Sequence, residues 1–111
     1  MKRLAVGVCA VAFLLLSSSD AAVYKGQKEY VKKCRKCHGG GQELASSKTM
    51  EEWENIMSND GTELIKFHLK DKKAKKALNY FEDKRFKKKA RHLEDFFVEY
   101  AEDSGNVPAC N

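Results

Sequence analysis

Two cysteines and a histidine within five residues constrain this chain more than any other feature. The stretch Cys34-Arg35-Lys36-Cys37-His38 places two thiols two residues apart, with an imidazole directly after the second thiol. This spacing is typical of covalent haem attachment, in which both thiols add to vinyl groups of one porphyrin and the histidine binds the iron. Redox dithiols and zinc half-sites share only the cysteine spacing. No second Cys-x-x-Cys pair or βαβ pattern accompanies the motif, so we predict one haem c.

The first 21 residues have the features of a bacterial secretory signal. The basic start Met1-Lys2-Arg3 precedes an apolar run at residues 4–16, and small residues at 17–22 suit cleavage after Ala21 or the residue that follows. A membrane span needs about 20 apolar residues, so we expect cleavage rather than a retained anchor. Cys9 lies inside the apolar run and should leave with the signal. Haem is attached to such motifs outside the cytoplasmic membrane, so the motif and the signal together predict a periplasmic protein.

The remaining chain of about 90 residues is close to the lower size at which a core folds unaided. We therefore expect one domain at residues 22–103, followed by a tail at 104–111. The sequence contains no alternating strand pattern, internal repeat or low-complexity block. We predict an all-α fold of about 4–5 helices, in which the covalently bound haem contributes apolar surface to a small core.

Apolar spacing and helix-end residues predict where these helices lie. Thr49 and Glu52 form the pattern of a capping box, and Asn59-Asp60-Gly61 should end the helix that follows it. The strongest three-and-four spacing of apolar residues occurs near the C-terminus. We expect helices at residues 23–39, 50–58, 62–69 and 86–102, a weaker helix within 70–81, and a polar loop at 42–48.

The segment around the cysteines resembles a known family. Gly26, Tyr30 and Cys34 are spaced four apart and lead into Cys37-His38-Gly39, which resembles the N-terminal helix of class I cytochromes c over residues 24–41. The resemblance implies that the glycine lets the C-terminal helix cross closely and that the aromatic residue packs at the crossing. It also implies a small mono-haem cytochrome that carries single electrons and is not an enzyme.

The resemblance further implies roles for individual residues. Cys34 and Cys37 hold the haem, and His38 is the proximal iron ligand. Tyr30 and Trp53 are expected to pack around the haem.

The sequence departs from the family at the second iron ligand. Class I members supply a methionine shortly before the C-terminal helix, and no methionine follows Met57 here. His68 is favoured because it lies on the apolar side of its predicted helix, where an imidazole needs a partner. His92 has mostly charged helical neighbours, while Met57 and Met50 lie on an early helix where methionine is usually a core residue. An iron without a sixth protein ligand is the remaining alternative.

The formal net charge of +5 falls to about +4 after the expected cleavage. Lysines cluster at residues 70–76 and 84–91, which favours docking to acidic surfaces of redox partner proteins. Nucleic-acid binding is not expected of an exported protein, and no stable membrane insertion is expected after cleavage. Cys110 has no cysteine partner left in the mature chain, so it is either an idle tail thiol or forms a disulfide with another chain.

Two other functions fit the same motif. A sensor or ligand-binding protein would have an open or displaceable sixth site on the iron. A haem subunit would instead be docked on a larger oxidoreductase. The sequence does not identify the electron donor, the acceptor or the reduction potential.

Overall fold

The structure is a computed structural model that describes residues 9–106 and consists of helices, with no strand in that range. The all-α prediction is confirmed. Residues 9–106 contain six α-helices instead of about 4–5, because two short ones at Arg35–His38 and Gly41–Ala45 are additional, while the helices expected at 50–58 and 62–69 form one kinked element. The helices are α1 (Cys9–Lys33), α2 (Arg35–His38), α3 (Gly41–Ala45), α4 (Met50–Lys70), α5 (Leu78–Glu82) and α6 (Phe86–Glu99), with a 3₁₀ helix, η1 (Lys72–Ala77), between α4 and α5.

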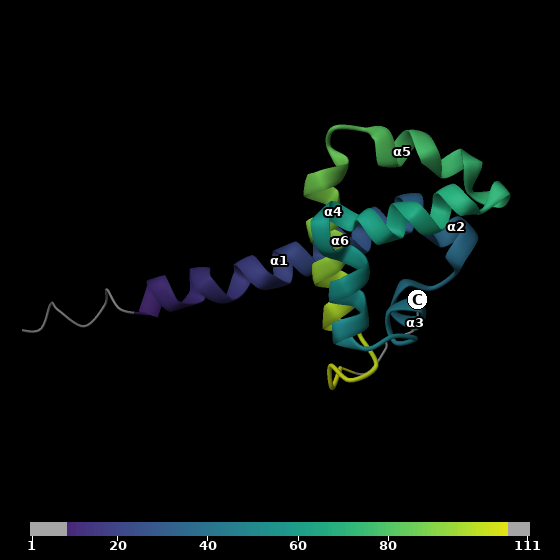
Figure 1. Cartoon of the computed structure of the whole chain (residues 1–111). Coiled ribbons are helices and arrows are strands. Elements are labelled where there is room, and N and C mark those ends of the chain that lie inside the picture. Colours follow the sequence, from purple (N-terminus) through teal and green to yellow (C-terminus); the bar gives the residue numbers. More distant parts are fainter. Residues whose placement is uncertain (1–8, 107–111) are drawn as a thin grey trace, which may run out of the picture.

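The first helix differs from the predicted 23–39 at both ends. It begins at Cys9 and stops at Lys33, and the cysteine motif continues in α2 after a break at Cys34. Figure 1 shows the N-terminal part of α1 extending away from the other helices. The apolar run is rich in alanine and leucine, which are good helix formers. The helix can therefore include residues that precede the predicted start at residue 23. Residues 1–8, which hold the basic start of the expected signal, lie outside the described residues.

The core lies where α1, α4 and α6 meet. Tyr30 from α1 is fully buried between Phe96 and Phe97 of α6, with ring centroids 5.9 and 6.0 Å away. Trp53 from α4 stacks on Phe97 at 4.2 Å, and its indole Nε1 donates a hydrogen bond to the Ala45 carbonyl at 2.7 Å. Tyr30 and Trp53 both belong to the interhelical core, and Tyr30 lies at the crossing of α1 and α6 where the resemblance places it.

The segment at 42–48, predicted to be a polar loop, contains helix α3. Two contacts hold this helix in place. The Trp53 indole binds the last residue of α3, and Gly41 packs so closely that a Cβ there would be 2.8 Å from Phe96 and 2.9 Å from Tyr30. Tertiary packing thus decides the conformation of a segment whose own sequence is polar.

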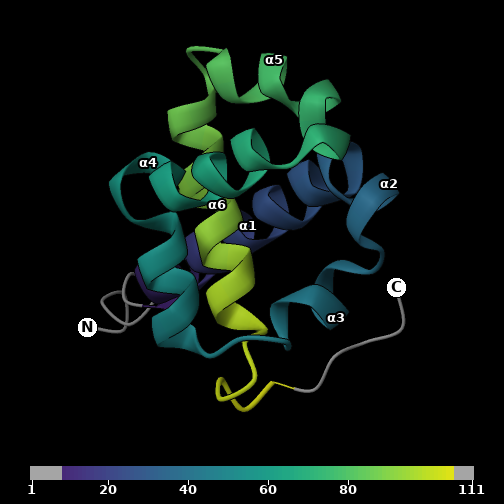
Figure 2. The same cartoon turned by 45° about the vertical axis from the view of Figure 1, so that its right-hand side comes forward.

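The capping box and the break after it are confirmed. The Thr49 hydroxyl accepts a hydrogen bond from the Glu52 backbone N–H at 3.1 Å, and the Glu52 side chain returns to the Thr49 backbone. Asn59, Asp60 and Gly61 all have positive φ, at 52°, 58° and 78°, which interrupts the helix. Figure 2 shows the two limbs of α4 running in clearly different directions. The second limb ends with His68 in its last turn.

The last helix ends at Glu99, three residues before the predicted end at 102. The chain after it is joined to the start of α4. The Glu102 N–H donates to the Lys48 carbonyl at 2.9 Å, and the Asp103 carboxylate accepts from the Met50 N–H at 2.8 Å. Cys110 lies outside the described residues, as does most of the tail. No helix in the described part of the chain is long and apolar enough to cross a membrane.

Candidate functional site

The cysteine motif forms one helical turn that presents two thiols and an imidazole together. The Cys34 carbonyl accepts hydrogen bonds from the N–H groups of Cys37 and His38, at 3.1 and 3.0 Å. Gly39 ends this turn with a φ of 77°, a conformation that glycine adopts without strain. The Tyr30 hydroxyl donates to the Gly39 carbonyl at 2.8 Å, so a core residue fixes where the motif ends.

The two cysteines have different surroundings. Cys34 is half-buried, and Cys37 is exposed. Burial, reinforced by the nearby Glu29 carboxylate, raises the pKa of the Cys34 thiol to about 12. The thiol is therefore protonated at neutral pH, unlike a reactive redox cysteine, whose pKa is lowered.

His38 faces a second histidine from a distant part of the chain. The rings of His38 and His68 have centroids 5.9 Å apart and planes inclined by 73°. Burial, followed by the proximity of His68, lowers the pKa of His38. The fold therefore brings the proximal ligand expected from the motif beside the favoured sixth-ligand candidate, at the end of α4.

Hydrogen bonding orients the His68 ring. Its Nδ1 lies 2.7 Å from the Leu64 carbonyl, one turn earlier in α4. A carbonyl only accepts, so Nδ1 must carry the proton and donate it. This leaves Nε2 unprotonated in the neutral ring, and metal-binding histidines commonly have this tautomer fixed by a backbone carbonyl.

The separation of the two ring centroids can be compared with that of two imidazoles bound to one metal ion. An imidazole nitrogen binds a metal at about 2 Å, and the ring centre lies roughly 1 Å beyond that nitrogen. Two imidazoles on opposite sides of one ion therefore have centroids about 6 Å apart by this arithmetic, compared with 5.9 Å between His38 and His68. The two thiols in the same turn as His38 complete the set of groups that haem c requires.

The other sixth-ligand candidates lie elsewhere. Met57 is 2% exposed and belongs to the buried core. Met50 begins α4, where its backbone is bound by Asp103, at the opposite end of the helix from His68. His92 is on α6 at the crossing with α1, where its carbonyl lies against Gly26. Of the four candidates, His68 is the residue whose ring lies next to that of His38.

Two aromatic residues near His68 were missed by the sequence analysis. The Phe81 ring lies 4.8 Å from the His68 ring, and Tyr80 lies 5.5 Å from Phe81. The Tyr80 hydroxyl donates to Glu29 Oε1 at 2.8 Å, and the Lys89 ammonium is 3.4 Å from the same oxygen. Burial and the bond to Glu29 raise the pKa of Tyr80. The weak helical amphipathicity of residues 74–81 was the sequence signal that could have placed Tyr80 and Phe81 on an apolar helix face.

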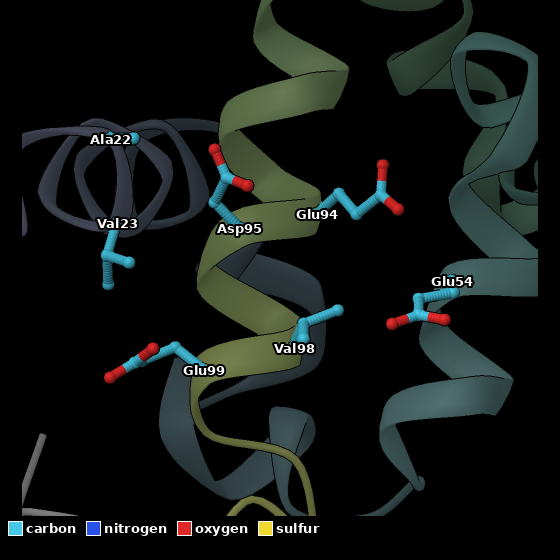
Figure 3. A pocket seen from close by; sticks show the side chains of 7 residues that line it. All are labelled: Ala22, Val23, Glu54, Glu94, Asp95, Val98 and Glu99. Carbon is cyan, nitrogen blue, oxygen red and sulfur yellow. The ribbon is translucent and has the colours of Figure 1, made fainter. Parts of the chain in front are cut away.

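A separate hollow of about 390 Å³ has acidic walls, as Figure 3 shows. Burial, and then the charges of Asp95 and Glu54, raise the pKa of Glu94. Ala22, the first residue after the expected cleavage, lines the same hollow. A free α-ammonium at this residue would partly offset the repulsion among the carboxylates.

Replacing Glu94 by glutamine should therefore raise the melting temperature by a few degrees at pH 7. Because folding raises the Glu94 pKa, the ionised carboxylate destabilises the native state, and this cost disappears as the pH falls below that pKa. The gain from Glu94→Gln should shrink at pH 4, as thermal unfolding followed by circular dichroism would measure. The exposed Glu102→Gln is the matched control. An equal or lower melting temperature for Glu94→Gln at pH 7 would contradict the prediction.

Within residues 9–106, no group of three or more histidine, cysteine, aspartate or glutamate side chains is arranged to hold a metal ion directly. Comparison of the chain with protein-family models, curated proteins and solved structures finds no match.

Proposed function

We propose that this chain is an exported mono-haem c-type cytochrome, similar to class I, that carries single electrons between redox proteins. Cys34 and Cys37 would hold the porphyrin through thioether bonds, and His38 and His68 would bind the iron. The observation that carries the proposal is the 5.9 Å separation of the two imidazoles beside a Cys-x-x-Cys-His turn. The protein itself catalyses no bond-making reaction in this proposal.

The bound haem supplies a reversible one-electron couple. Cys34 and Cys37 in the α2 turn would hold one porphyrin edge, and His38 and His68 would be the iron ligands. Two protein ligands would leave no free position on the iron for an outside ligand, which favours an electron carrier over a sensor. Two nitrogen ligands without a thioether predict a low reduction potential.

The crossing of α1 and α6 supports the class I comparison. A Cβ at Gly26 would lie 2.7 Å from the His92 carbonyl carbon and 2.8 Å from the Phe96 Cβ, so the helices meet with no room for a side chain. Tyr30, one turn later on α1, packs on the same part of α6. This is the arrangement that the resemblance implies for the glycine and the aromatic residue.

The test is to produce the full chain in bacteria that attach haem c and to purify the exported protein. We expect a red protein with one haem per chain, shown by its pyridine haemochrome spectrum and by mass spectrometry. Cys34→Ser and Cys37→Ser should each reduce covalent haem incorporation, while Cys110→Ser should not. A colourless protein with both motif thiols free would overturn the proposal.

Carbon monoxide separates the carrier from the sensor. The ferrous protein of a bis-histidine carrier should bind carbon monoxide slowly, because His68 must first leave the iron. Rapid binding at neutral pH would favour the ligand-binding alternative. Size-exclusion of a native extract would reveal a stable larger oxidoreductase complex, which is expected only if the chain is a haem subunit.

Partner docking is proposed to use the lysines that follow His68. Lys70, Lys72, Lys73, Lys75 and Lys76 are all exposed. A basic surface close to an iron ligand would attract an acidic redox partner and make the encounter rate dependent on salt. Lys72→Glu combined with Lys73→Glu should weaken the salt dependence of electron transfer, whereas Lys25→Glu with Lys28→Glu on α1 should change it less. An unchanged dependence in the first variant would count against this docking surface.

A further inference from the structure

We propose that Phe81 is a positioning residue that braces the His68 imidazole and so slows its replacement on the iron by small ligands. This inference rests on the proposed haem function. It goes beyond that function because it gives a role to α5, a short helix that contributes no iron ligand: α5 slows the dissociation of His68 from the iron.

His68 needs a restraint from outside its own helix. It lies in the last turn of α4, just before the helix ends at Lys70. Terminal turns fray because their last carbonyls lack intrahelical partners. The hydrogen bond to the Leu64 carbonyl fixes rotation of the ring within the turn, but it moves with that turn.

Phe81 supplies a contact from a different element. Its ring centroid is 4.8 Å from that of His68, with planes inclined by 54°, which is within the usual range for favourable aromatic pairs. The two residues are separated along the chain by η1, so the contact joins two different helices, α4 and α5. The ring thus limits the space into which the imidazole can swing.

Phe81 is itself held firmly. Phe86, which is 2% exposed at the start of α6, meets it edge-on at 5.1 Å. Tyr80 packs on both phenylalanines, at 5.5 and 5.4 Å. The brace is therefore continuous with the buried core.

A polar tether fixes α5 to the rest of the molecule. A helix of five residues has little stability of its own. The Tyr80 hydroxyl binds the Glu29 carboxylate on α1 at 2.8 Å, and Lys89 of α6 lies 3.4 Å from the same oxygen. The Glu29 side chain is only 14% exposed, so this link joins three helices in a region with little solvent screening. Tyr80 and Phe81, adjacent in sequence, thereby connect the helix before the motif to the sixth ligand.

The experiment measures how fast carbon monoxide binds to the reduced holo-protein at saturating gas, where departure of His68 limits the rate. We expect Phe81→Ala to bind at least tenfold faster than the wild type and Phe81→Leu to be intermediate, because leucine keeps apolar volume but not a flat ring. Phe81→Tyr, which keeps the ring, should restore the slow rate. Asn79→Ala, an exposed change on the same short helix, is the matched control and should leave the rate unchanged.

A second control separates bracing from general loss of stability. Val98→Ala weakens a half-buried contact on α6 and should lower the melting temperature without changing the carbon monoxide rate. If Phe81→Ala fails to accumulate with haem, Phe81→Leu alone decides the matter. Folded Phe81→Ala and Phe81→Leu variants that bind carbon monoxide as slowly as the wild type would overturn the brace. A wild type that binds as fast as His68→Ala would instead overturn His68 as ligand, so the two failures are distinguishable.

Discussion

Gly26→Ala should destabilise the protein by about 3 kcal/mol, at the upper end of the usual cost of overpacking. The added Cβ would lie 2.7 Å from the carbonyl carbon of His92 and 2.8 Å from the Phe96 Cβ. Neither atom can move away easily, because the His92 carbon belongs to the backbone and the Phe96 Cβ is the first atom of a fully buried side chain. The two helices would have to separate, which would disturb the packing of Tyr30 nearby.

Whether Gly26→Ala raises or lowers the free energy of unfolding distinguishes a close helix crossing from an uncrowded helix. Alanine is a better helix former than glycine by about 1 kcal/mol, so the same change in an uncrowded helix would stabilise the protein. Chemical denaturation of the purified protein measures the free energy of unfolding directly. Lys28→Ala, at an exposed position on α1, is the matched control and should change it little. A neutral or stabilising Gly26→Ala would contradict the close crossing.

His68→Met should raise the reduction potential by on the order of 0.1 V, a part of the about 0.8 V range that axial ligands cover. A thioether favours ferrous iron more than an imidazole does. The oxidised variant should also gain the red absorption band that is typical of methionine bound to ferric haem in class I cytochromes c, the family that the sequence resembles. Redox titration followed by visible spectroscopy measures both effects.

His92→Met and His68→Ala provide the comparison. His92→Met should leave the potential and the spectrum unchanged, because that residue lies at the α1–α6 crossing. His68→Ala should bind carbon monoxide rapidly, since the sixth position is then open. A wild-type protein that already has the methionine band, or a potential unmoved in both His68 variants, would show that another residue binds the iron.

Much of the local structure could be predicted from the sequence. The capping box at Thr49 and Glu52, the break at Asn59-Asp60-Gly61 and the apolar stripe of the last helix each depend on residues close in the chain. Capping and left-handed turns are decided by local hydrogen bonds and sterics, so their signals survive in the sequence alone. The break at Cys34, which places Cys37 and His38 in a separate helical turn, was not predicted, since the sequence indicated one helix through residue 39.

Other features depended on the tertiary structure. The helix at 41–45 forms because Trp53, Tyr30 and Phe96 pack against it, which no local pattern indicates. The sequence placed His68 first among four sixth-ligand candidates on helical periodicity, but its contact with His38 requires α4 to bend and fold back beside α2. Phe81 reaches His68 only through the path of η1 and α5. Local chemistry therefore determined which residues are candidates for binding a haem. Long-range packing decided which of these residues face one another, because such contacts join segments whose separation along the chain carries no information about their distance in space.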